Sequence, residues 1–205
     1  MPYDAAFYEQ YRAYINEPQV RRNHDRMFRL FAQIMFPELP AVMDLGAHES
    51  VGEYAIKDKL HADYTGIDIH NTNGGITHGF RRMSFLRADY MDLDFTGRLS
   101  FEPNAFISLF SVEPSYSPAV RYGFYNRLFA KFSSVRWGLA SGFFYESRRA
   151  AESVSETGDI VSYQTIEDPS LHLSPLFTEL RVHLRTPSRM FGNDVIEAWK
   201  IFIRN

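Results

Sequence analysis

Helical patterns and apolar runs alternate along the first two thirds of the chain. Apolar side chains recur every three or four residues in 5–16 and in 23–36, which predicts two amphipathic helices. Pro18 is expected to break the chain between them, and Asn23 or Asp25 is available to cap the second helix. Continuous apolar runs then predict buried strands at 42–45, 64–69, 83–88, 104–110 and 135–144.

Further helices are expected between these strands. One is predicted at 50–60, and so short a β-α-β connection implies a right-handed crossover between parallel strands. A clearer helix begins after Ser117, where proline follows a capping serine. Its apolar positions recur every four residues, at Val120, Phe124, Leu128 and Phe132. The strand at 104–110, apolar throughout, is expected near the centre of the sheet.

The last third of the chain changes to strand alternation. A short β run is predicted at 160–166, and alternating apolar positions at 180–184 and 195–203 predict an antiparallel hairpin. The expected fold is therefore α/β, with helices on both faces of a mostly parallel sheet and a C-terminal hairpin. We expect one domain, 1–205, in which 1–36 form a helical cap and 146–177 an inserted or mobile region.

The composition excludes several kinds of chemistry. The chain has no cysteine, which removes disulfides, thiolate metal sites and a cysteine nucleophile. Its seven histidines include no H-x-x-x-H pair, so no metal site is expected. A net charge of −3 gives no overall field for nucleic acid, and no apolar run approaches the roughly 18 residues of a membrane span. We expect a cytoplasmic protein that binds no membrane, with nucleic acid only as a secondary option.

The candidate chemistry follows the first two strands. The first strand leads into Asp44-Leu45-Gly46, and the second ends near Asp68. A glycine turn after one strand, with an acidic residue about 20 positions later at the end of the next, is typical of a β-α-β unit that binds a nucleoside. The alternative for Asp68 is an acidic turn residue or a helix cap.

This arrangement resembles the class I S-adenosylmethionine-dependent methyltransferase family over roughly residues 20–205. In that family the first strand ends in an acidic residue, one further residue and a run of alternating glycines. Asp44-Leu45-Gly46 matches the opening, whereas His48 and Ser50 occupy the positions of the second and third glycines. The resemblance implies a Rossmann-like, seven-stranded class I methyltransferase fold. The side chain of His48 either contacts the ligand, blocks it or faces solvent, and these alternatives stay open.

The resemblance also implies roles for individual residues. The carboxylate of Asp68 would accept hydrogen bonds from both ribose hydroxyls, and that of Asp89 from the adenine amino group, with the Tyr90 amide facing a ring nitrogen. Glu113 and Tyr116, after the fourth strand, are candidates to orient an acceptor or take its proton, with loop packing as the alternative. The full set implied for the cofactor is Asp44, Gly46, Ala47, His48, Asp68, Ile69, Asp89, Tyr90 and Phe110.

Two functions from different classes follow. The first is methyl transfer from S-adenosylmethionine to an oxygen or nitrogen atom of a small-molecule acceptor. The second is a catalytically inactive methyltransferase-like domain that serves in binding or interaction, motivated by the missing glycines. A dinucleotide site fits less well, because it needs glycine at position 48 for the backbone to meet a pyrophosphate. An RNA or protein acceptor is a third possibility, raised by 18 arginines against 4 lysines and by the pairs Arg81-Arg82 and Arg148-Arg149.

Overall fold

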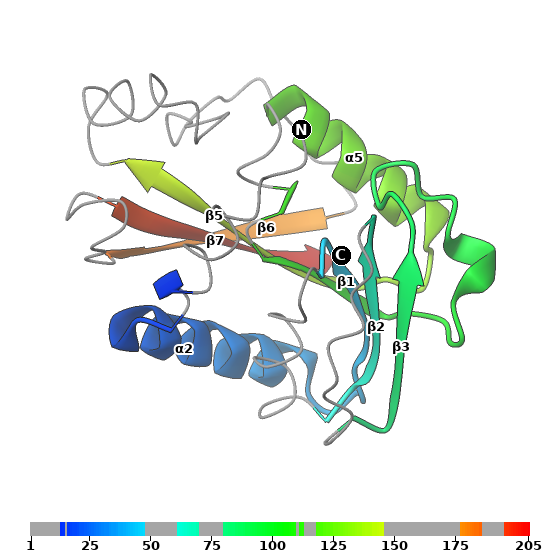
Figure 1. Ribbon diagram of the computed structural model, residues 1–205, viewed down its shortest axis with the longest axis horizontal. Helices are drawn as coiled ribbons and strands as arrows, with labels where there is room; N and C mark the ends of the chain where they lie inside the picture. The colour runs from blue at the N-terminus through cyan, green and yellow to red at the C-terminus, as the bar shows by residue number, and fades with distance from the viewer. Residues whose placement is uncertain are drawn as a thin grey trace.

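A seven-stranded sheet with a helix on each face forms the body of the protein (Figure 1). The computed structural model describes residues 13–14, 16–47, 61–69, 80–109, 111–112, 118–145, 177–185 and 195–205. Its elements are α2 (Pro18–Met35), β1 (Ala41–Leu45), β2 (Asp63–Asp68), β3 (Arg82–Arg87), the 3-10 turn η1 (Thr96–Arg98), β4 (Ala105–Leu109), α5 (Pro118–Lys131), β5 (Trp137–Tyr145), β6 (Phe177–Arg185) and β7 (Val195–Arg204).

The strand order is β3-β2-β1-β4-β5-β7-β6. Strands β1 to β5 pair in parallel, whereas β7 runs antiparallel to both β5 and β6. This order confirms the predicted class I methyltransferase fold, including the C-terminal hairpin and the central place of β4. The bounds of β1 to β5 differ from the predicted ones by only one or two residues. The helix predicted at 50–60 and the strand at 160–166 lie outside the described residues, as does most of the helix at 5–16.

Helix α2 covers one face of the sheet, and its start differs from the prediction. Pro18 does not break the chain but is the first residue of the helix, where its missing N–H costs nothing. Asn23, predicted as a cap, is instead buried within the helix, and its Nδ2 donates to Glu197 Oε2 at 3.4 Å. The helix therefore begins at Pro18 and ends at Met35, before the proline at position 37.

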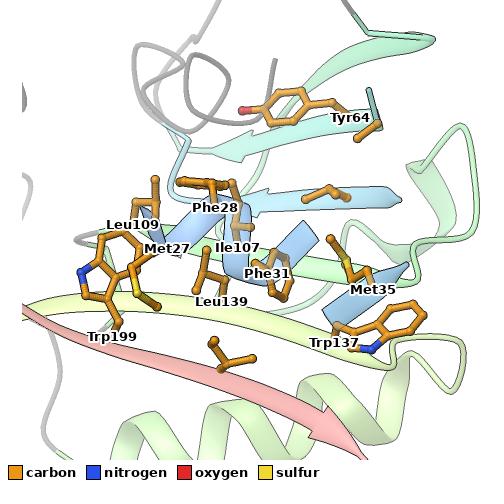
Figure 2. Close-up of a cluster of buried hydrophobic side chains, with 14 of the residues drawn as sticks. Met27, Phe28, Phe31, Met35, Tyr64, Ile107, Leu109, Trp137, Leu139 and Trp199 are labelled. Atoms are coloured by element: carbon orange, nitrogen blue, oxygen red, sulfur yellow. The ribbon is translucent and has the colours of Figure 1, made fainter. Parts of the chain in front are cut away.

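Each face of the sheet has its own apolar cluster. The α2 face gathers Met27, Phe28 and Phe31 from the helix against side chains of the sheet such as Leu109 and Trp199 (Figure 2). On the opposite face, side chains of α5 pack over the strand side chains that point away from α2. In β1, Val42 belongs to the α2 cluster, and Met43 and Leu45 to the α5 cluster. Because side chains alternate along a strand, Asp44 faces the α2 side.

Some of the predicted apolar positions are exposed, among them Val120 and Leu180. Val120, in the first turn of α5, is 45% exposed, because a strict four-residue repeat drifts off the buried face of a helix with 3.6 residues per turn. Leu180 is 42% exposed on β6, which forms the edge of the sheet. The neighbouring Val182 and Leu184 pack partly against the α2 cluster, as the alternation predicts.

Candidate functional site

The predicted cofactor residues follow the ends of three adjacent strands. Asp44 is the penultimate residue of β1 and Gly46 follows that strand, Asp68 ends β2, and Asp89 follows β3. These strands are parallel, so their carboxyl ends meet at one edge of the sheet. In open α/β sheets this edge borders the crevice that binds ligands. The fold therefore brings together the positions that the sequence singled out.

Gly46 makes the turn that leaves β1. Its φ of 75° lies in the left-handed region, and its N–H donates to the Ile67 carbonyl at 2.8 Å. The next amide, that of Ala47, donates to the same carbonyl at 3.2 Å. A Cβ on Gly46 would lie 2.5 Å from Ser111 Cβ and 3.2 Å from Tyr90 Cε1. Glycine is required here by the backbone conformation and by close packing against the residues that follow β3 and β4.

Ser108 and Ser111 link the end of β4 to the end of β1 by hydrogen bonds. The Ser111 hydroxyl donates to the Leu45 carbonyl at 2.6 Å and shares a hydrogen bond of 2.7 Å with the Ser108 hydroxyl. The Val112 amide donates to Ser108 Oγ at 3.2 Å. The sequence prediction named the acid and the tyrosine that follow but missed these serines. Their signal was available, since two hydroxyls that flank a buried strand end must find partners.

Asp44 is bound by a residue that the prediction also missed. Its side chain is 1% exposed, and its Oδ2 accepts a hydrogen bond of 2.7 Å from the Tyr64 hydroxyl. Tyr64 lies on β2 and is fully buried. A buried carboxylate in an apolar strand requires a donor. The sequence could have prompted a search for one, but it could not say which side chain supplies it.

Asp68 occupies the expected place at the end of β2. Its side chain is buried, at 6% exposed, and it is paired in register with Arg87 of β3. The Asp68 carbonyl accepts from the Ala88 amide at 2.9 Å. Ile69, the next residue, is 44% exposed, and its carbonyl accepts from Arg87 Nε at 3.1 Å. These bonds tie the ends of β2 and β3 together beside the predicted nucleoside position.

Asp89 and Tyr90 begin the loop after β3. Asp89 is exposed, and its Oδ1 accepts from the Met91 amide at 2.8 Å, so one carboxylate oxygen caps its own turn. Tyr90 is half-buried between the Gly46 turn and α5, where its ring meets Phe124 edge to face at 6.1 Å. His48, Phe110, Glu113 and Tyr116 lie outside the described residues, so their assigned roles stay predictions.

Arg81 and Arg82 lie at the opposite edge of the sheet, where β2 and β3 begin. Arg81 Nη2 is 2.5 Å and Arg82 Nη2 2.7 Å from Oδ2 of Asp63, whose side chain is 1% exposed. The hydrogen bond from Arg81 is the main cause that holds the pKa of Asp63 far below its usual range. This arginine pair is therefore occupied by a structural carboxylate, away from the candidate site.

Glu197 is a further buried carboxylate on the α2 face. Glu197 of β7 accepts from the Tyr14 hydroxyl at 2.5 Å and from Trp199 Nε1 at 3.2 Å, and His24 Nε2 is 4.0 Å away. Burial lowers the pKa of His24 to about 4, an effect that the nearby Asp25 partly opposes. The sequence prediction did not single out these residues, which lie far apart along the chain.

Two further features of the described residues concern partners. Within the described ranges, no three histidine or acidic side chains gather as a metal-binding group. No helix in the described part of the chain has the length and apolarity to span a membrane.

Comparison with known proteins agrees with the fold. No protein-family model matches the chain, and no curated protein matches it. Solved structures match it over nearly its whole length. The N-methyltransferase NodS from Bradyrhizobium japonicum WM9, in complex with S-adenosyl-L-homocysteine, is 12% identical, with 92% of this chain and 89% of that chain covered and a TM-score of 0.59.

Two other methyltransferase structures are similar to the same degree. Geranyl diphosphate methyltransferase, in complex with GPP and sinefungin, is 10% identical, with 92% and 81% of the two chains covered and a TM-score of 0.60. Magnesium protoporphyrin IX methyltransferase from Synechocystis PCC 6803, with bound SAM, is 15% identical, with 98% and 92% covered and a TM-score of 0.55. At these identities the likeness establishes the class I methyltransferase fold.

Proposed function

We propose that the protein is an S-adenosylmethionine-dependent methyltransferase that acts on an oxygen or nitrogen atom of a small molecule. One observation carries the proposal: the left-handed Gly46 turn and the buried carboxylates of Asp44 and Asp68 adjoin at the carboxyl edge of a class I methyltransferase sheet. The similar structures add support, because their names state small-molecule substrates or bound S-adenosyl ligands.

The residues present fit this cofactor. Asp68 would accept from the two ribose hydroxyls, and charge-assisted acceptors of this kind are among the stronger hydrogen-bond partners. The second carboxylate oxygen of Asp89 and the amide of Tyr90 would face the adenine. Gly46 and Ala47 would line the loop beside the methionine part, with Asp44 behind them. When bound, S-adenosylmethionine supplies a methyl group activated by its positively charged sulfur.

The chain itself would contribute mainly by positioning. Holding the acceptor atom in line with the methyl group lowers the barrier by several kcal/mol. Glu113 or Tyr116, as candidates after β4, would orient the acceptor, and a positioned base adds on the order of 10²–10⁴-fold only where the acceptor must lose a proton. The tyrosine-rich segment 5–16 and the region 146–177 are the candidate acceptor pocket. The cysteine-free sequence supports a cytoplasmic setting.

Calorimetric titration with S-adenosylhomocysteine tests the cofactor site. The wild-type protein should bind, and Asp68→Ala should weaken binding by about 10–100-fold, because hydrogen bonds to a charged group contribute about 1.5–3 kcal/mol. Asp94→Ala, at an exposed position in the loop after β3, is the matched control and should bind as the wild type does. Absence of binding at millimolar ligand, or an unchanged affinity in Asp68→Ala, would refute the proposal. Binding of NADH instead would support a dinucleotide site.

A catalytically inactive binding domain is the second candidate, favoured by His48 and Ser50 in place of glycines. It also predicts binding of S-adenosylhomocysteine, so titration alone does not separate the two. Methyl transfer from labelled S-adenosylmethionine to a panel of phenols, carboxylic acids and amines does. Turnover of any of them supports the enzyme, whereas cofactor binding with no transfer across the panel favours the binding domain.

A further inference from the structure

We infer that Tyr64 is a positioning residue of the cofactor site, because its hydroxyl holds the Asp44 carboxylate in place at the end of β1. This inference rests on the proposed function and adds to it a residue near the start of β2. It concerns how the site is built, since Tyr64 would act through Asp44 without touching the cofactor.

The register of β1 and β2 explains why these two side chains meet. Asp44 is paired with Gly66, and Val42 with Tyr64, in the parallel ladder. Side chains of one strand alternate between faces, so Tyr64, Gly66 and Asp68 all project to the α2 face, where Asp44 also lies. Gly66 places no side chain between its neighbours. The tyrosine hydroxyl therefore reaches Asp44 Oδ2 diagonally across the ladder, at 2.7 Å.

The ring that carries this hydroxyl is itself held by aromatic contacts. Its centroid lies 4.9 Å from that of Phe80, with the planes inclined by 30°, and 6.0 Å from that of Phe85, at 70°. Tyr64 is fully buried within the α2 cluster and is drawn with its hydroxyl in Figure 2. Because the ring is held by packing, the Tyr64 hydroxyl favours one orientation of the Asp44 carboxylate. The ring also loses little further rotational freedom when a ligand binds.

The position of Asp44 makes this orientation matter for binding. Asp44 and Asp68 are on adjacent strands, on the same face and near the same carboxyl edge, where the cofactor is proposed to bind. A carboxylate that takes part in binding must point in one direction, because misplacement by about 1 Å weakens binding or catalysis strongly. The hydrogen bond from Tyr64 to Oδ2 restrains the Asp44 carboxylate in this way.

The affinity for S-adenosylhomocysteine tests this role in a double-mutant cycle of wild type, Tyr64→Phe, Asp44→Ala and the double variant. Tyr64→Phe should weaken binding about tenfold, the effect of one hydrogen bond to a charged group. If Tyr64 acts through Asp44, the same substitution should add less than about twofold in the Asp44→Ala background, which has no acceptor for the hydroxyl. An unchanged affinity in Tyr64→Phe, or a full tenfold loss in both backgrounds, would overturn the inference.

Tyr122→Phe is the matched control. The Tyr122 hydroxyl donates to Glu179 Oε2 at 2.9 Å, so this variant also removes a buried tyrosine hydroxyl from a carboxylate, but between α5 and β6. It should bind as the wild type does, and an equal loss in this variant would show that a general structural effect accounts for both. Should Tyr64→Phe fail to fold, Asp44→Ala and the double variant decide: equal affinities support the inference, and a tenfold difference refutes it.

The outcomes separate this inference from the proposed function. A wild-type protein that binds no S-adenosylhomocysteine refutes both. A wild-type protein that binds, with Asp68→Ala impaired and Tyr64→Phe unimpaired, leaves the proposed function in place and refutes only the role of Tyr64.

Discussion

Gly46 lies so close to Ser111 that a Cβ on the glycine would be 2.5 Å from the serine Cβ. The contact joins the ends of β1 and β4, which are neighbours at the centre of the sheet. Because the Ser111 hydroxyl also donates to the Leu45 carbonyl at 2.6 Å, side-chain and backbone contacts define the turn together. The sequence predicted the Gly46 turn from its role in ligand binding. Contacts within the protein are themselves sufficient to require glycine at this turn.

Gly46→Ala should destabilise the protein by about 2–4 kcal/mol, since the left-handed φ costs about 1–2 kcal/mol and overpacking adds a comparable amount. Urea unfolding measures the change. Gly46→Ala should cost less when it is measured in a Ser111→Gly background, which removes the clashing Cβ but leaves the backbone strain. A Gly46→Ala variant as stable as the wild type would contradict the close packing.

Gly138 and Gly123 should respond to alanine in opposite directions. A Cβ on Gly138 of β5 would lie 2.2 Å from Cε1 of Phe106, whose ring stacks on Tyr125 at 5.6 Å and so has little room to move. Gly138→Ala should therefore cost about 1–3 kcal/mol of unfolding free energy. Gly123, within α5, has no atom beyond its chain neighbours and its own helical backbone within 4 Å of the added Cβ, and Gly123→Ala should stabilise by about 0.5–1 kcal/mol.

Chemical denaturation of the two variants under one set of conditions checks both signs. The pair controls for the general effect of replacing glycine, because each change adds the same methyl group. Destabilisation of equal size at both positions would contradict the local explanation.

The free energy of unfolding should decrease as the pH falls from about 6.5 to 4, because of the buried His24. Its pKa is lowered to about 4 in the folded state, because the ring is buried against Trp199 at 5.1 Å. Between the two pKa values the unfolded chain binds the proton more readily, so stability rises with pH in that range. The full effect is about 3 kcal/mol and is present below pH 4.

Unfolding free energies of wild type and His24→Gln at several pH values isolate this contribution, since all other groups titrate in both proteins. The difference between the two proteins should change by about 3 kcal/mol from pH 7 to pH 4. His61→Gln, at an exposed position, controls for the loss of a histidine. A constant difference between wild type and His24→Gln would show that His24 is protonated as easily in the fold as in the unfolded chain.

Local signals accounted for most of the elements. Proline after a capping serine and a recurring apolar stripe predicted α5, and apolar runs predicted β1 to β5 nearly to the residue. The error at α2 arose from reading Pro18 as a break, when proline is equally suited to the first turn of a helix. The place of Asp68 was also predictable, since it depends only on where a strand ends.

The partners of polar side chains were decided by tertiary structure. Continuous apolar runs identified β1 to β5, alternation of apolar and polar residues identified the hairpin of β6 and β7, and the glycine after the first run identified the turn at Gly46. These local patterns did not identify Tyr64 as the donor to Asp44, Ser111 as the neighbour of Gly46, or Asp63 as the acceptor for two arginines. Those pairings depend on strand order and register, which arise only when distant segments pack and their buried polar groups must satisfy one another.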